Sequence, residues 1–71
     1  MNKKRSIIHK PYMGFKGWLK TNEVKYEDIA KLLGISKSTV SNKINGFSDF
    51  LLYEISTIVS EYGTSYDIFK N

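Results

Sequence analysis

The chain has 71 residues, of which 41% are hydrophobic, and this is enough for one small domain with a single core. It contains no cysteine, so disulfides and thiolate metal sites are excluded and a reducing, cytoplasmic compartment is the simplest expectation. No apolar run approaches the roughly 20 residues that span a bilayer, and the N-terminus lacks the apolar stretch of a signal peptide.

The net charge of +4 is unevenly distributed along the chain. Residues 1–45 contain ten lysines or arginines and three acids, whereas residues 46–71 contain one lysine and four acids, which gives +7 and −3. This asymmetry favours a polyanion such as nucleic acid bound on one side of the protein. A merely solvated surface is the alternative interpretation.

Residues 1–11 are expected to form an extended basic arm before a helical domain of residues 12–71, because Pro11 disfavours helix in the residues before it. The cluster Lys3, Lys4 and Arg5 is either a solvated tail or an arm that contacts phosphates or the minor groove of DNA. His9 is the single histidine, and it is interpreted as a surface residue because no cysteine or acid lies near it in sequence.

Apolar residues at helical spacing predict four helices and a short fifth one. The first covers about residues 12–21, with Phe15 and Trp18 in the core, and the second covers 26–33. The third begins at Ser36, whose hydroxyl can cap it, and ends at Asn45-Gly46.

The fourth helix has the strongest apolar stripe, with Ser48 or Asp49 as its cap and Gly63 as its end. A final short helix is expected at 65–69, which makes the fold class all-α, a compact bundle of four to five short helices. Several apolar residues near the C-terminus are either internal or form an exposed patch where another chain docks. The stripe comprises Leu51, Ile55, Ile58, Val59 and Tyr62, and the ambiguous residues are Leu52, Tyr53, Tyr66, Ile68 and Phe69.

The connection between the second and third helices is too short for them to lie antiparallel, so they are expected to cross steeply. Ala30 supplies a small residue where the helices touch, and Gly34 supplies the turn. The pattern I-A-x-x-L-G-I-S-x-S-T-V-S-x-x-I-N-G is typical of a helix-turn-helix. Its apolar anchors are Ile29, Leu33, Ile35, Val40 and Ile44.

The chain here resembles the Cro and CI type of phage repressor domain, the lambda repressor-like helix-turn-helix family, over about residues 15–69 and above all in YEDIAKLLGISKSTVSNKING. The resemblance implies a five-helix domain that binds operator DNA, often as a homodimer, with its third helix in the major groove. It also places the base contacts on Lys37, Ser38, Ser41 and Asn42. Two positions depart from the family pattern: Tyr26 replaces a common glutamine, and Phe47 replaces a basic or polar residue.

The residue types of the third helix suit this role. Asparagine can bond an adenine edge, lysine can donate to guanine, and serine can serve either base. A solvated face is the alternative, but such faces usually carry better helix formers than serine, threonine and asparagine. The candidates for phosphate contact are Tyr26, Ser36, Thr39, Lys43, Asn45 and the amide of Gly46.

The sequence therefore predicts a sequence-specific transcriptional regulator, a Cro-like repressor of a phage or prophage acting in the bacterial cytoplasm at the nucleoid. The alternative is an antirepressor that binds the cognate repressor protein of the same genetic switch. No enzyme activity, cofactor or metal site is expected, because the chain has no cysteine, one histidine and no phosphate-binding glycine loop.

Overall fold

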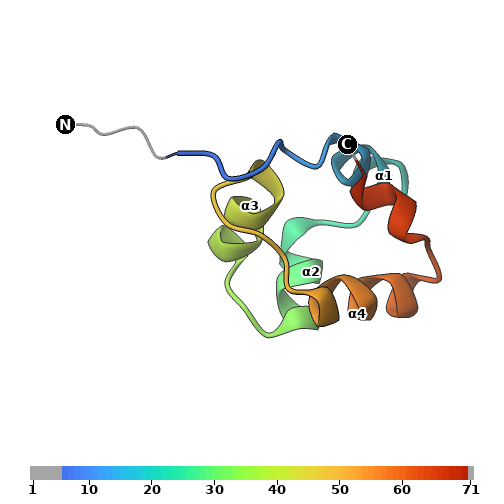
Figure 1. The fold of residues 1–71 in the computed structure, drawn as a ribbon. Coiled ribbons are helices and arrows are strands. Elements are labelled where there is room, and N and C mark those ends of the chain that lie inside the picture. The colour runs from blue at the N-terminus through green and yellow to red at the C-terminus, as the bar shows by residue number, and fades with distance from the viewer. Residues whose placement is uncertain (1–5, 71) are drawn as a thin grey trace.

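The computed structural model describes residues 6–70, and over this range the chain is all-helical and contains no strand (Figure 1). The all-α prediction is thus confirmed. The elements are α1 (Met13–Thr21), α2 (Tyr26–Leu33), α3 (Lys37–Asn45), α4 (Leu52–Tyr62) and the 3₁₀ helix η1 (Tyr66–Phe69).

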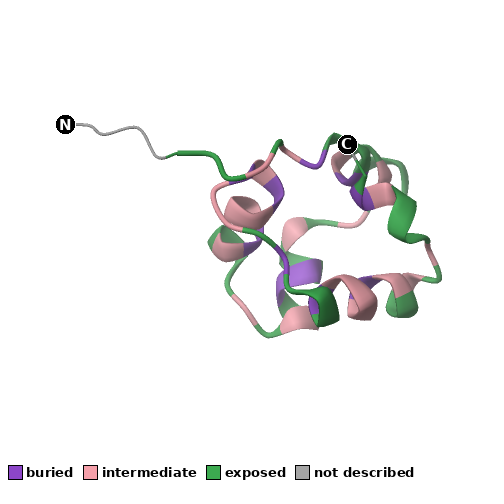
Figure 2. Cartoon of the chain, in the orientation of Figure 1, coloured by how far each residue is buried: buried purple, intermediate pink, exposed green. Residues whose placement is uncertain are grey.

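A single core lies between these elements. α2 packs against both α3 and α4, while η1 packs against α1 and α4. Figure 2 shows the buried residues on the inner sides of the helices. Aromatic rings dominate one end of the core, where Phe15 meets Phe50 edge to face with ring centroids 6.0 Å apart and meets Phe69 at 4.6 Å. These contacts join α1, the loop before α4 and η1.

The ends of α2, α3 and α4 lie where the sequence predicts them. Gly34, Gly46 and Gly63 are the C-caps of the three helices and have φ of 71°, 96° and 61°. Phe15 is fully buried, whereas Trp18 is half-buried at the edge of the core, against the rings of Phe15 and Tyr62.

The start of α4 differs from the prediction. The helix begins at Leu52 with Leu51 as its N-cap, and neither Ser48 nor Asp49 caps it. Phe50 is buried in the core, and Leu51 is exposed rather than part of the buried stripe. The physical reason is that the carboxylate of Asp49 is engaged elsewhere, where it accepts hydrogen bonds from the Tyr12 hydroxyl and from the Phe50 amide.

The C-terminal apolar residues divide between core and surface. Phe69 is buried and Ile68 is half-buried, but Leu52 and Tyr53 are 75% and 64% exposed. Tyr66 is also exposed, and its hydroxyl lies 2.9 Å from the Ser56 hydroxyl, so it rests on α4 one turn beyond Leu52. We call the exposed group the α4 patch; it comprises Leu51, Leu52, Tyr53 and Tyr66.

Candidate nucleic-acid interface

The turn between α2 and α3 is three residues long and is held by backbone hydrogen bonds. Gly34, with its φ of 71°, directs its amide to the carbonyl oxygen of Ala30, and the Ile35 amide donates to the same oxygen at 3.0 Å. Ala30 is buried, and Ile35 is half-buried against the core. The turn therefore fixes how α3 leaves α2, and α3 lies across the end of the molecule (Figure 1).

The first turn of α3 is closed by hydroxyl groups. The Oγ of Ser36 accepts a hydrogen bond from the Thr39 amide at 3.0 Å and lies 2.7 Å from the Thr39 hydroxyl. This is the cap that the sequence predicts, and it satisfies one of the amides left without a partner at a helix start. Lys37 and Ser38 follow the cap and are exposed.

One side of α3 is anchored in the core and the opposite side is polar. Val40 and Ile44 are fully buried, one helical turn apart. Of the four residues predicted to contact bases, Lys37 lies one turn before Ser41 and Ser38 one turn before Asn42, since residues four apart on a helix lie on one face. Lys37 and Ser38 are exposed and Ser41 and Asn42 are half-buried, so all four reach solvent along α3.

Asn45 belongs to the same side of α3 and is hydrogen-bonded within the helix. Its Nδ2 donates to the Ser41 carbonyl oxygen at 2.9 Å and to the Ser41 Oγ at 3.2 Å. Ser41 thus accepts from Asn45 with its hydroxyl oxygen, which leaves the hydroxyl hydrogen for an external acceptor. Asn45 orients Ser41 in this arrangement.

Lys43 contacts the protein itself rather than facing outward from α3. Its ammonium lies 2.9 Å from Glu54 Oε1 and 3.1 Å from the Asp49 carbonyl oxygen. The side chains of Lys43 and Glu54 are only 12% and 3% exposed. This cation, a candidate for phosphate contact, therefore links α3 to α4.

Gly46 is also engaged within the protein. Its amide donates to the Asn42 carbonyl oxygen as part of the α3 C-cap, and the residue is buried. A residue whose amide hydrogen closes the helix has no donor left for a phosphate. Tyr26, at the start of α2, is half-buried and its ring packs against the core.

The segment before α1 covers the C-terminal end of α3. The Ile8 amide donates to the Gly46 carbonyl oxygen at 2.7 Å, and the Tyr12 amide donates to the Ile44 carbonyl oxygen at 2.9 Å. Carbonyls at a helix end lack partners within the helix, so these two bonds satisfy groups that would otherwise face solvent. We call residues 6–12 the docking segment. The basic cluster Lys3, Lys4 and Arg5 lies outside the described residues.

His9 is not the surface residue that its sequence context indicates. Its side chain is 16% exposed, and its Nε2 lies 2.8 Å from the Ser48 carbonyl oxygen. The two residues are 39 positions apart, so no local pattern in the sequence could reveal this contact.

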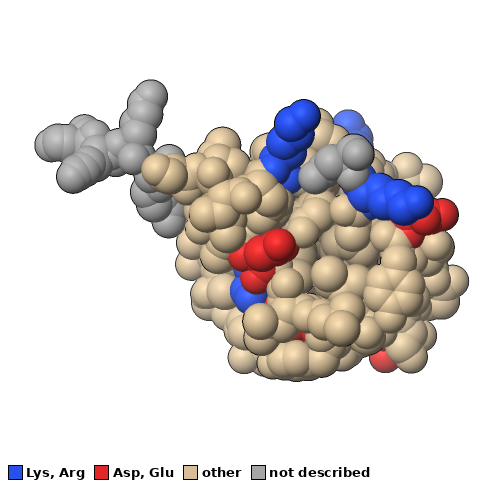
Figure 3. All heavy atoms as spheres, in the orientation of Figure 1, with Lys and Arg blue, Asp and Glu red and all other residues tan. Residues whose placement is uncertain are grey.

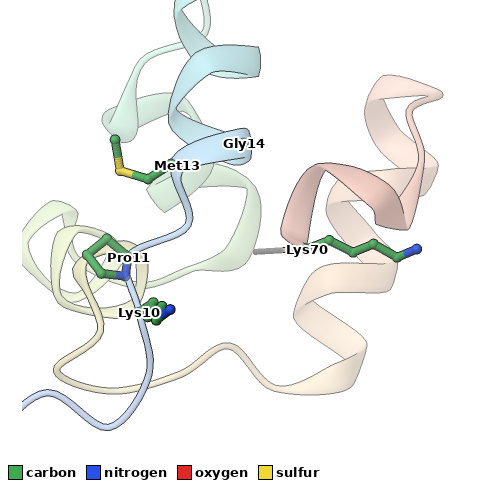
Figure 4. Close-up of a pocket in the computed structure, with 5 residues that line it drawn as sticks. All are labelled: Lys10, Pro11, Met13, Gly14 and Lys70. Carbon is green, nitrogen blue, oxygen red and sulfur yellow. The ribbon is translucent and has the colours of Figure 1, made fainter.

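A pocket between the start of α1 and the end of η1 is lined by Lys10, Pro11, Met13, Gly14 and Lys70, with the Lys70 side chain extending away from Pro11 (Figure 4). Over residues 6–70, no histidines and acids gather in a set that could hold a metal ion. Within the same range, no helix has the length and apolar character needed to cross a membrane.

Comparisons of the chain with protein-family models, curated proteins and solved structures find no match.

Proposed function

We propose that the protein is a sequence-specific DNA-binding transcriptional regulator that inserts α3 into the major groove of operator DNA. The observation that carries the proposal is the construction of α3: Val40 and Ile44 anchor it in the core, while the polar residues Lys37, Ser38, Ser41 and Asn42 are exposed or half-buried. A recognition helix needs both properties, an anchored side and an outward side able to reach base edges.

The side chains on this surface supply the donors and acceptors that base edges require. Asn42 matches an adenine edge, Lys37 can donate to guanine, and the two serines can serve either base. Their small size lets the helix approach the groove closely. Ser36, Thr39 and Tyr26 remain the candidates for phosphate contact, whereas the donors of Lys43, Asn45 and Gly46 are used within the protein.

The mechanism that suits this size and surface is steric occlusion. A bound domain would cover a short operator and exclude RNA polymerase, as expected of a Cro-like repressor of a phage or prophage in the bacterial cytoplasm. This assignment of family and source rests on the resemblance of residues 26–46 to the Cro and CI type of repressor domain. The structure supports the assignment because the resembling stretch forms two helices, α2 and α3, joined by a turn of three residues.

A gel-shift titration against the promoter region beside the protein's own gene tests the proposal. Binding that survives competitor DNA and maps to a short palindrome is expected. Affinity should fall with salt, because the basic cluster Lys3, Lys4 and Arg5 would release a counterion for each phosphate that it neutralises. Weak binding that is equal for all DNA sequences would contradict a repressor function.

Replacing Asn42 by alanine is expected to weaken operator binding by about 1–3 kcal/mol and to relax the preference at one base pair. The reason is that a bidentate contact to one base would be lost while the phosphate contacts remain. Binding to a panel of operators, each mutated at one position, measures both effects. Ser60→Ala, at an exposed position of α4, is the control and should bind as the wild type does. An equal loss on every operator would show that Asn42 does not contact a base.

We infer that the α4 patch is the contact with a second copy of the chain. The patch contains no charged residue, and Figure 3 shows mainly uncharged atoms over the face that α4 presents. Two copies, each with a net charge of +4, repel one another least where neither brings charge to the contact. A two-fold dimer would also present two α3 helices to half-sites about 34–36 Å apart on DNA.

Leu52→Glu is expected to weaken self-association at least about tenfold, because burial of a leucine side chain contributes about 1.5–3 kcal/mol. Sedimentation equilibrium measures the change, and Ser60→Glu on the same helix is the matched control for charge. A wild-type chain that stays monomeric at high micromolar concentration would contradict the dimer. If such a monomer captured the cognate repressor through Leu52, the antirepressor function would be favoured instead.

A further inference from the structure

His9 lies between two carbonyl oxygens. Its Nε2 is 2.8 Å from the oxygen of Ser48, and its Nδ1 is 2.8 Å from the oxygen of Lys10. A carbonyl oxygen only accepts hydrogen bonds, and a neutral imidazole carries one N–H and one lone pair. A neutral ring would therefore direct its lone pair at one of the two oxygens. Only the imidazolium, with two N–H groups, donates to both.

The charges around the ring also favour a cation. Asp49 Oδ1 lies 3.4 Å from His9 Nε2 and accepts hydrogen bonds from the Tyr12 hydroxyl and the Phe50 amide. Burial, followed by the hydrogen bond to Asp49 and the charge of that carboxylate, raises the pKa of Tyr12 to about 12, so Tyr12 stays a neutral donor. The rings of His9 and Tyr12 lie 4.5 Å apart.

Two other charged groups lie near His9. On α3, the ammonium of Lys43 is paired with Glu54 of α4, and on the docking segment the neighbouring charge is that of Lys10. His9 also lies beside the C-terminal end of α3, where the helix dipole favours a positive charge. Partial burial lowers the pKa of His9, but the carbonyls of Lys10 and Ser48 and the charge of Asp49 outweigh it, and the pKa is raised above 6.5.

We propose that the imidazolium of His9 is a proton-operated latch, which holds the docking segment against the end of α3 and the loop that follows it. Loss of the proton removes one of the two carbonyl bonds and the attraction to Asp49. The bond from Tyr12 to Ile44 then remains and Tyr12 stays anchored in the core, whereas the bond from Ile8 to Gly46 is left to hold residues 6–10 without the histidine and opens more often. Opening is therefore expected at residues 6–10. These contacts lie within the chain and involve none of the four residues proposed to contact bases.

The direction of the pH effect follows from linkage. A group whose pKa is higher in the folded than in the unfolded state contributes its full stabilisation below the unfolded value, here 6.5. That contribution disappears as pH rises through the raised folded value. The latch is thus closed below pH 6.5 and opens as pH rises through the raised pKa of His9, in the range where histidine acts as a switch.

Nuclear magnetic resonance of the wild-type chain tests the latch. The nitrogen shifts of the imidazole follow the proton on His9, which is the only histidine and so needs no assignment among rings. Amide hydrogen exchange at Ile8, corrected for its intrinsic dependence on pH, follows attachment of the segment. Both transitions should share one midpoint above pH 6.5, and protection at Ile8 should fall across it.

Two variants separate the latch from general changes in stability. His9→Gln can donate to Ser48 but cannot take up a proton, so protection at Ile8 should no longer depend on pH. Asp49→Asn keeps the size of the side chain and should move the midpoint of His9 down toward 6.5. The latch is refuted by a wild-type midpoint at or below 6.5, by protection at Ile8 that does not follow the ring, or by a His9→Gln variant that retains the pH dependence.

Discussion

Replacing Glu54 by glutamine is expected to destabilise the fold by about 3–5 kcal/mol, because it leaves the buried ammonium of Lys43 without a counter-charge. Glu54 is 3% exposed as a side chain, and its Oε1 accepts from both Lys43 Nζ and the Leu51 amide at 2.9 Å. The same oxygen therefore closes the first turn of α4 and binds α3. Loss of its charge should weaken both.

The expected loss is a large part of the total stability. A domain of this length has an unfolding free energy of about 4–10 kcal/mol at the usual value per residue. A loss of about 3 kcal/mol would lower the melting temperature by at least about 12 °C. Urea denaturation at pH 7 measures the change, and the midpoint should fall while the slope stays the same if the fold is retained.

Two comparisons identify the cause. Glu61→Gln makes the same change at an exposed position of α4 and should alter stability by less than about 0.5 kcal/mol. The double variant Lys43→Met/Glu54→Leu replaces the pair by apolar side chains and should recover most of the loss, because no charge is then left unpaired. If Glu54→Gln cost less than about 1 kcal/mol, the pair would behave as an exposed one.

The parts of the fold that could be predicted are those determined by neighbours in sequence. Gly34 and Ser36 lie next to the helices they terminate or cap, and Val40 and Ile44 are spaced so that any α-helix places them on one side. The solvent-accessible residues of α3, Lys37, Ser38, Ser41 and Asn42, follow from the same periodicity. For this reason the surface of the candidate interface could be located before its structure was known.

The parts that could not be predicted depend on distant partners. Asp49 is a good helix cap by residue type, but Tyr12, 37 positions away, takes its carboxylate, and α4 starts later as a result. Lys43 resembles a phosphate ligand by position, but Glu54 draws it inward. His9 has no acid near it in sequence and yet lies beside Asp49. In each case a contact with a residue far away in sequence decides the role of the side chain, and the neighbouring residues in sequence do not reveal that contact.

Replacing Gly46 by alanine is expected to cost about 2–5 kcal/mol and to detach the docking segment from α3. Gly46 has a φ of 96°, in a region that costs an L-residue about 1–2 kcal/mol. An added Cβ would also overlap the backbone carbonyl of His9 and lie 2.7 Å from Ile7 Cγ2. Backbone cannot rotate away as a side-chain tip can, so the overlap should add about 1–3 kcal/mol of strain or displace the segment.

Gly34→Ala is the matched control for Gly46→Ala. Gly34 also has a positive φ and also ends a helix, but an added Cβ there meets nothing within 4 Å, so only the backbone cost of about 1–2 kcal/mol is expected. The excess cost at position 46 therefore measures the contact with the docking segment. In Gly46→Ala, amide protection at Ile8 should be lost and the titration midpoint of His9 should move toward 6.5, whereas Gly34→Ala should preserve both. Equal losses of stability in the two variants, with His9 unaffected, would mean that the docking segment does not lie against Gly46 in solution.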